Sequence, residues 1–286
     1  MLDIKRVGVC GSGLMGSGIA QVTASAGFDV VVLEAVPAAL ERGMQNIAKS
    51  LAKFVDKGSL KSGERDAVLA RLKTTTDVAD LKQCDLVIEA IVENVDEKKR
   101  LFVQLDKLLP AESLICTNTS SLCVIEIAAI TKRPQRIAGL HFFNPVPLMK
   151  LVEIVKTIVT SQETIDTLYR FAAKLGKTPV LAQDTPGFIV NRLLVPYLLN
   201  AIRVYESGLA SREDIDESMK LGCGHPMGPL TLLDFVGLDT TYYIAEIMFA
   251  EFKEPMFAPP PLLKRMVLAG HHGRKSGKGF YDYSAS

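Results

Sequence analysis

A glycine-rich turn near the N-terminus constrains the fold more than any other feature of this sequence. Residues 6–10 form an apolar run typical of a buried strand, and Gly11-Ser-Gly-Leu-Met-Gly follows directly. A second apolar run, residues 29–33, ends at Glu34. A strand, a G-x-G-x-x-G turn, a helix, a second strand and an acidic residue, in that order, are typical of a dinucleotide-binding βαβ unit.

The three glycines of the turn have different physical roles in such a unit. Gly11 permits the tight turn, Gly13 lets the backbone approach a pyrophosphate, and Gly16 lets the helix pack closely on the strand. The N-terminus of the helix offers unpaired N–H groups and a positive dipole end to phosphate. We therefore predict that the cofactor-binding turn comprises Gly11, Ser12, Gly13, Leu14, Met15 and Gly16.

Glu34 indicates which dinucleotide is bound. A carboxylate at the end of the second strand accepts hydrogen bonds from the adenosine ribose hydroxyls and repels a 2′-phosphate. Residues 35–37 supply no Arg or Lys that would hold such a phosphate. Glu34 alone is equally consistent with an exposed acid at a strand end, but in this context it predicts NAD rather than NADP as the cofactor.

Composition excludes several classes of protein. The chain has 286 residues, of which 48% are hydrophobic and 23% charged, as in ordinary globular proteins. A net charge of +1 gives no electrostatic basis for binding nucleic acid or an anionic membrane. No apolar run reaches the length of a membrane span, and the first strand begins too early for a signal peptide. Five cysteines without a C-x-x-C pair indicate reduced thiols, and we expect a cytoplasmic protein without a metal site.

Strands and helices are predicted to alternate through the first part of the chain. This alternation predicts an α/β fold with a Rossmann-like, doubly wound, mostly parallel sheet. Ligands bind beyond the carboxyl ends of the strands in such sheets, and Glu93, Asn118, Ser120 and His141 are expected just after strands. The expected strands are residues 85–90, 114–117, 136–141 and 150–155, and the expected helices are residues 36–56, 63–72 and 95–108.

The pattern changes near residues 184–187, after which only helices are predicted. They are residues 188–207, 212–221, 230–251 with a possible break, and 262–269. We therefore expect an NAD-binding Rossmann-like domain at 1–185 and an all-helical C-terminal domain at 186–286. The first of these helices is apolar nearly all round, which fits either a central core helix or, as we favour, a helix shared with a second subunit. Pro196 is expected to kink it.

One imidazole lies in the apolar segment 139–145, and a carboxylate follows in the next expected strand. His141 and Glu153 are the residue types that a dehydrogenase uses to move a proton near neutral pH. The carboxylate fixes the tautomer of the ring and stabilises the imidazolium. Taken alone, the segment is equally consistent with a hydrogen-bonded core histidine and a solvated strand glutamate.

Taken together, the motifs of this chain resemble those of the 3-hydroxyacyl-CoA dehydrogenases, and most closely those of the stand-alone 3-hydroxybutyryl-CoA enzymes. The resemblance covers essentially the whole chain, and the motifs occur in the family's order. They are the glycine-rich turn at 11–20, Glu-Ala-Ile-Val-Glu-Asn at 89–94, Thr-Asn-Thr-Ser-Ser-Leu at 117–122, Gly-Leu-His-Phe-Phe-Asn-Pro at 139–145, Asp-Thr-Pro-Gly-Phe-Ile-Val-Asn-Arg at 184–192, Pro-Met-Gly-Pro at 226–229 and Gly-Leu-Asp at 237–239.

The resemblance implies an NAD-dependent oxidoreductase that interconverts (S)-3-hydroxyacyl-CoA, here 3-hydroxybutyryl-CoA, and 3-oxoacyl-CoA, here acetoacetyl-CoA. His141 is then the general acid/base and Glu153 orients it. Ser120 and Asn191 are implied to be catalytic and substrate-binding residues that donate hydrogen bonds to the substrate oxygen. Without the family, Ser120 is equally consistent with a helix cap and Asn191 with a polar helix residue.

The resemblance also extends to cofactor, coenzyme A and subunit contacts. It implies that NAD is contacted by Glu93, Lys98, Ser120, Asn144 and Lys275. Ser50 and Lys57 match the family's coenzyme A positions, although Lys57 is equally consistent with a solvated lysine on a charged helix face. The implied partners are an acyl-CoA substrate and a second copy of the chain, bound through the C-terminal helices as a homodimer.

Two other functions remain open from the sequence. A non-enzymatic, crystallin-like or NAD-binding structural protein would use the same scaffold, and a hydroxyacid dehydrogenase would act on a free acid. The second class commonly uses a lysine base, whereas this sequence offers the His141–Glu153 pair. That pair also argues for an enzyme, since a fold by itself does not determine a function.

Overall fold

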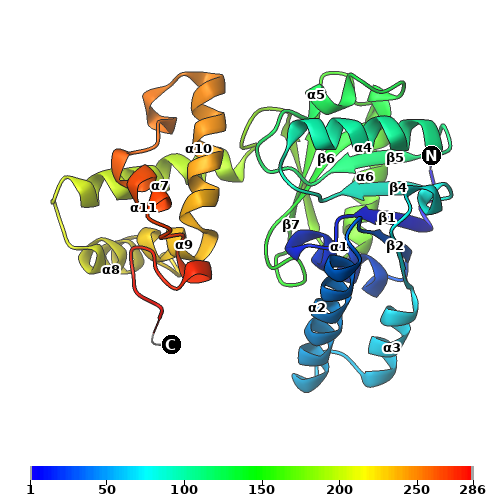
Figure 1. The fold of residues 1–286 in the computed structure, drawn as a ribbon, viewed down its shortest axis with the longest axis horizontal. Coiled ribbons are helices and arrows are strands. Elements are labelled where there is room, and N and C mark those ends of the chain that lie inside the picture. The colour runs from blue at the N-terminus through cyan, green and yellow to red at the C-terminus, as the bar shows by residue number, and fades with distance from the viewer. Residues whose placement is uncertain (1, 285–286) are drawn as a thin grey trace. The chain divides into compact units, whose positions relative to one another are not determined.

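The computed structural model describes residues 2–284 and divides into two compact units (Figure 1). The first comprises the chain up to Thr119 together with Cys123–Asp184. The second comprises Ser120–Leu122 and the chain from Thr185 onward. Every named strand lies in the first unit, and the second is built from helices (Figure 1).

The first unit contains an eight-stranded sheet with the strand order β3-β2-β1-β4-β5-β6-β7-β8. Strands β1 to β6 are parallel, β7 is antiparallel to β6, and β8 is parallel to β7. The predicted doubly wound, mostly parallel sheet is therefore confirmed. The strand order reverses between β1 and β4, which is where such sheets bind ligands. The strands are β1 (Arg6–Cys10), β2 (Asp29–Leu33), β3 (Leu72–Thr75), β4 (Leu86–Glu89), β5 (Leu114–Thr117), β6 (Ile137–Phe142), β7 (Leu151–Lys156) and β8 (Thr178–Gln183).

Two strands were not predicted, and both lie at edges of the sheet. β3 has no buried residue, and its Lys-Thr-Thr sequence carries no apolar run. β8 is mostly exposed and contains Pro179, a residue that the ladder tolerates only at edges. The helix expected over 63–72 ends at Ala70, because the chain turns there into β3.

Helices pack on the sheet and bury its apolar side chains. Val7, Val9 and Val30 point into the core on the face covered by α1, α2 and α6, whose inner residues include Ile19, Ile47 and Leu168. Alternation of side chains along each strand places the remaining strand residues on the opposite face. The helices of this unit are α1 (Leu14–Ser25), α2 (Pro37–Asp56), α3 (Ser62–Ala70), α4 (Val95–Leu108), α5 (Val124–Ala128) and α6 (Gln162–Lys174), with short 3-10 turns at Val78–Leu81 and Pro134–Arg136.

The second unit has its own apolar core, formed by residues such as Leu198, Leu233 and Met248. The expected break in the stretch 230–251 falls at Gly237, whose φ of +105° suits glycine. Helix α7 continues as one helix through Pro196. The helices are α7 (Val190–Glu206), α8 (Arg212–Cys223), α9 (Pro229–Val236), α10 (Leu238–Phe252) and α11 (Pro261–Leu268), with 3-10 turns at Pro255–Phe257 and Arg274–Ser276.

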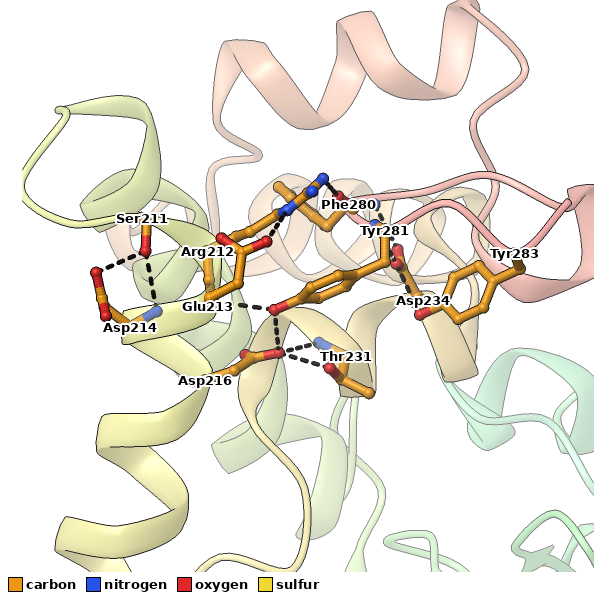
Figure 2. A network of polar contacts seen from close by, with 10 residues as sticks. All are labelled: Ser211, Arg212, Glu213, Asp214, Asp216, Thr231, Asp234, Phe280, Tyr281 and Tyr283. Carbon is orange, nitrogen blue, oxygen red and sulfur yellow. Dashed lines mark hydrogen bonds and ion pairs between the residues drawn. The ribbon is translucent and has the colours of Figure 1, made fainter. Parts of the chain in front are cut away.

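Two buried aspartates fasten the C-terminal segment to these helices (Figure 2). Asp234 of α9 accepts hydrogen bonds from the N–H groups of Phe280 and Tyr281 at 2.8 and 2.9 Å. Asp216 of α8 accepts from the Tyr281 hydroxyl at 2.9 Å and from the Thr231 N–H at 2.9 Å, so it also caps α9. Burial raises the pKa of Asp234, and the hydrogen bonds from the N–H groups of Tyr281 and Phe280 oppose that shift.

Three of the five cysteines, Cys10, Cys84 and Cys116, are buried, and none of the five forms a disulfide. Burial raises the pKa of the Cys84 thiol to about 12, which makes it unreactive as a nucleophile. Within residues 2–284, the helices are too short or too polar to cross a membrane. In the same range, no group of His, Cys, Asp and Glu side chains is arranged to hold a metal ion.

Candidate active site

The glycine-rich turn between β1 and α1 leaves no room for side chains at two of its positions. Gly11 has a φ of +98°, and a Cβ there would lie 2.5 Å from the Ala90 carbonyl oxygen. A Cβ on Gly16 would lie 1.9 Å from the carbonyl oxygen of Gly11. A Cβ on Gly13, in contrast, would meet nothing within 4 Å. The turn is therefore closed on the protein side and open at Gly13, where a ligand's phosphates can approach the backbone.

The N-terminus of α1 suits an anion. Its N-cap is Gly13, which supplies no side-chain hydrogen bond, and its first turn contains no acidic residue. The first N–H groups of a helix have no acceptor within the helix, and their dipoles favour negative charge. This combination fits the pyrophosphate of a dinucleotide.

Glu34 lies directly beside this turn. Its Oε2 accepts hydrogen bonds from the N–H of Ser12 at 3.0 Å and from the Ser12 hydroxyl at 3.2 Å. A Cβ on Gly43 of α2 would lie 2.5 Å from the Ser12 carbonyl oxygen, so the helix after Glu34 also packs on the turn. The carboxylate therefore lies at the carboxyl ends of β1 and β2, the position for which the sequence analysis predicts a ribose contact.

His141 and Glu153 face each other across the antiparallel strands β6 and β7. The His141 Nδ1 and a Glu153 carboxylate oxygen are 2.7 Å apart, and the side chains are only 7% and 1% exposed. With the Nδ1 proton directed at the carboxylate, a neutral ring carries its lone pair on Nε2. This burial rules out a solvated Glu153. One expectation was wrong: His141 lies within β6, because that strand continues to Phe142.

Ser120 and Asn191 lie together in the second unit. The Asn191 side-chain amide donates a hydrogen bond to the Ser120 carbonyl oxygen at 3.4 Å. Asn191 is in the first turn of α7, whereas Ser120 is in the loop after β5. Ser120 is not a helix cap, because α5 begins at Val124 and its N-cap is Cys123.

A buried ion-pair network joins the ends of β4 and β5. Lys98 is 1% exposed, and its Nζ lies 2.6 Å from a Glu89 oxygen and 3.2 Å from a Glu93 oxygen. Glu89 is fully buried and also accepts from the Thr117 hydroxyl at 2.7 Å, while the Thr119 hydroxyl donates to Glu93. Burial raises the pKa of Glu89, and Lys98 opposes the shift. Of Glu89, Glu93 and Lys98, only Glu93 is substantially exposed, at 28%.

Sequence reasoning did not single out Glu89 as a functional residue. The signal was present, since a carboxylate that ends a buried strand requires a partner. The sequence did not identify that partner. Lys98 lies on the following helix, α4, in a run of charged residues that is typical of a solvent-exposed helix face.

The remaining predicted site residues are dispersed over the two units. Asn144 lies in the connection between β6 and β7, whose start is held by a 2.9 Å hydrogen bond from the Phe142 N–H to Asn118. Lys275 forms an ion pair with Asp239 within the second unit, 2.6 Å apart. Ser50 is half-buried in α2, and the exposed Lys57 is the C-cap of that helix.

Comparison with known proteins identifies a family for both parts of the chain. Residues 6–185 match the family model of the 3-hydroxyacyl-CoA dehydrogenase NAD-binding domain, and residues 187–283 match the model of the C-terminal domain. A 3-hydroxybutyryl-CoA dehydrogenase of Mycobacterium tuberculosis is 51% identical over 98% of this chain and 99% of its own length. The human mitochondrial hydroxyacyl-coenzyme A dehydrogenase is 50% identical over 98% of this chain and 91% of its own.

A solved structure shows the same fold over the whole length. The (S)-3-hydroxybutyryl-CoA dehydrogenase of Ralstonia eutropha is 43% identical and superposes with a TM-score of 0.95, covering 98% of this chain and 99% of its own. The two family models together span nearly all of the described residues. This chain therefore belongs to the 3-hydroxyacyl-CoA dehydrogenase family, and residues 6–185 are its NAD-binding domain.

Proposed function

We propose that this protein catalyses the NAD-dependent interconversion of (S)-3-hydroxyacyl-CoA and 3-oxoacyl-CoA, with 3-hydroxybutyryl-CoA and acetoacetyl-CoA as its substrate pair. The observation that carries the proposal is the buried pair of His141 and Glu153 at 2.7 Å. The relatives named above act as dehydrogenases of this class, which favours an enzyme over the crystallin-like structural role.

His141 moves the proton in this proposal. Bound NAD supplies the hydride acceptor, and the 3-hydroxyl of the substrate must lose its proton together with the hydride. His141 accepts that proton at Nε2, and the Glu153 carboxylate stabilises the resulting imidazolium. In the reverse direction the imidazolium returns the proton to the carbonyl oxygen of the 3-oxoacyl substrate. Because the pair is buried, its charge interaction is little screened by water.

Ser120 and Asn191 donate hydrogen bonds to the same substrate oxygen. That oxygen gains negative charge in the transition state, and oriented neutral donors stabilise it without having to reorganise. Removal of one such donor lowers the rate by about a hundredfold or more. The hydrogen bond from Asn191 to the Ser120 backbone supports a joint role, because it fixes one residue relative to the other.

The proposed cofactor contacts lie along the glycine-rich turn and at the carboxyl ends of the strands. The backbone of residues 11–16 binds the pyrophosphate, and Glu34 binds the adenosine ribose and selects NAD. Further contacts are assigned to polar residues that the family resemblance indicates, namely Glu93, Lys98, Ser120, Asn144 and Lys275.

Coenzyme A and a second subunit complete the proposal. Ser50 and Lys57 are assigned to coenzyme A, and the exposure of Lys57 allows its ammonium to meet a phosphate. The chain is proposed to be a cytoplasmic homodimer, with residues 1–185 as the NAD-binding domain and 186–286 as the dimerisation and substrate domain. Exposed apolar side chains on the helical unit support the dimer, Leu193 of α7 being 71% exposed.

The test is NADH oxidation with acetoacetyl-CoA, run beside NADPH and beside free acetoacetate. Fast turnover that needs both NADH and the thioester supports the reaction, the coenzyme A requirement and the role of Glu34. Turnover with free acetoacetate would favour a hydroxyacid dehydrogenase. Tight NADH binding without turnover of acetoacetyl-CoA or longer 3-oxoacyl-CoA thioesters would favour the structural role.

A further inference from the structure

Lys177 is a buried cation that the proposed reaction does not use. It lies between α6 and β8, is 9% exposed, and forms no ion pair with any carboxylate of residues 2–284. Its Nζ instead donates hydrogen bonds to the backbone carbonyl oxygens of Val146, at 2.5 Å, and Met149, at 2.8 Å. Burial lowers the pKa of Lys177, as expected for an ammonium group without a counter-charge.

Both carbonyl groups belong to the connection between β6 and β7, residues 143–150. Pro145 accepts hydrogen bonds from the N–H groups of Leu148 and Met149, which makes this connection a compact turn. Val146 is buried, and a Cβ on Gly18 of α1 would lie 2.8 Å from its Cβ. The connection is therefore held against the nucleotide-binding helix on one side and by Lys177 on another.

The strands that flank the connection are held independently of Lys177. His141 pairs with Glu153 in the β-ladder, and the Phe142 N–H donates to Asn118. Loss of the Lys177 ammonium therefore leaves the His141–Glu153 contact intact. What it releases is the middle of the segment that carries Asn144, which the packing of Val146 and the turn at Pro145 also retain. The ends of the segment are held by the ring contact of Phe143 with His141 and by the hydrogen bond from the Thr178 N–H to the Lys150 carbonyl oxygen.

An apolar side chain at position 177 would avoid the cost of burying a charge. The ammonium instead makes two charge-assisted hydrogen bonds to one loop, and such bonds are roughly twice as strong as neutral ones. Within residues 2–284, Lys177 is the one side chain that donates hydrogen bonds to these two loop carbonyls.

We propose that Lys177 is a positioning residue for cofactor binding, which clamps the connection 143–150 so that Asn144 is presented to NAD. The proposal rests on the proposed function, because that function assigns Asn144 to the cofactor. Its specific consequence is a change in NADH affinity with little change in the chemical step.

The test compares Lys177→Met with Lys174→Met, an exposed lysine of the same region that serves as the matched control. We expect Lys177→Met to weaken NADH binding, measured by fluorescence titration, by about tenfold, since loss of one positioned hydrogen bond changes a binding constant by about that factor. The Michaelis constant for acetoacetyl-CoA and kcat at saturating NADH should change by less than about threefold. Lys177→Arg, which retains two donors, should restore most of the affinity.

Amide hydrogen exchange tests the clamp without any assay of turnover. Exchange should rise in residues 143–150 of Lys177→Met and remain unchanged in β6 and β7. Unchanged exchange in that segment, or unchanged NADH affinity, would overturn the proposal. A fall in thermal stability with exchange raised across the whole unit would also overturn it, because the role would then be structural. If wild-type protein fails to oxidise NADH, the proposed function fails, and the exchange experiment still shows whether Lys177 restrains the connection 143–150.

Should Lys177→Met not fold, Lys177→Gln takes its place. The same result is expected of it, weaker NADH binding with nearly unchanged kcat.

Discussion

Replacement of Glu153 by glutamine removes the charge from the buried pair and leaves its shape unchanged. The His141 Nδ1 and the carboxylate oxygen are 2.7 Å apart. At that distance, an imidazolium and a carboxylate attract each other by about 6 kcal/mol at an effective dielectric of about 20. The glutamine oxygen still accepts from Nδ1–H, so the tautomer is retained and roughly half of this interaction survives as a neutral hydrogen bond.

The remaining loss of about 3 kcal/mol falls on the state in which His141 is charged, and it corresponds to a decrease of about a hundredfold in kcat. Folding should be little affected, because a neutral imidazole beside a glutamine leaves no buried charge uncompensated. The assay is NADH oxidation with saturating acetoacetyl-CoA, together with an NADH titration and a thermal unfolding curve. Glu112→Gln, an exposed position, is the matched control.

A kcat for Glu153→Gln within about fivefold of wild type would refute the reasoning, since it would mean that the carboxylate supplies less than about 1 kcal/mol to the charged state. A large loss of kcat accompanied by loss of NADH binding or by unfolding would also refute it, because the effect would then not lie in the proton transfer.

Four further outcomes are expected. His141→Gln should bind NADH normally and lose at least about a hundredfold in turnover, and normal activity with acetoacetyl-CoA would contradict the role of the base. Glu34→Ala should raise the ratio of kcat/KM for NADPH to that for NADH by about tenfold or more, because the repulsion of a 2′-phosphate is removed. Gly16→Ala should abolish NADH binding in titration, because its Cβ would lie 1.9 Å from the Gly11 oxygen, whereas Gly63→Ala, with nothing within 4 Å, should bind normally. Burial raises the pKa of Asp234, so the native state binds this proton more readily than the unfolded chain, and the contribution of Asp234 to stability should fall as pH rises through that pKa. Asp234→Asn lacks this dependence, and its melting temperature relative to wild type should therefore rise between about pH 4 and pH 7, where an unchanged difference would contradict the reasoning.

Most of the first unit could be predicted from hydrophobic patterning. β4 and β5 are fully buried, and their continuous apolar runs stand out in the sequence. β3 and β8 could not be recognised in this way, because an edge strand buries few side chains and β8 carries Pro179 besides. In the second unit a possible break was predicted within residues 230–251. The structure places it at Gly237, where glycine weakens a helix.

The candidate site was predictable where its function requires particular residue types. The glycine turn is visible because Gly11 and Gly16 lie where any side chain would collide with backbone. His141 and Glu153 were recognisable by residue type and through the family resemblance, whereas their contact depends on the register of β6 and β7. That register follows from the length and path of the connection 143–150, which periodicity does not reveal.

Side chains that form hydrogen bonds with backbone groups leave no pattern in the sequence. Lys177 binds two carbonyl oxygens, and Asp184 accepts from the N–H groups of Val124 and Ile125 at 2.8 and 2.7 Å. Every residue supplies a carbonyl, and nearly every residue an N–H, so the partner's identity carries no information about such a contact. A pair of side chains such as Glu89 and Lys98 is at least recognisable as opposite charges once both are known to be buried. The residues that hold the loops of this site in place are therefore found from the structure, while those that carry its chemistry are found from the sequence.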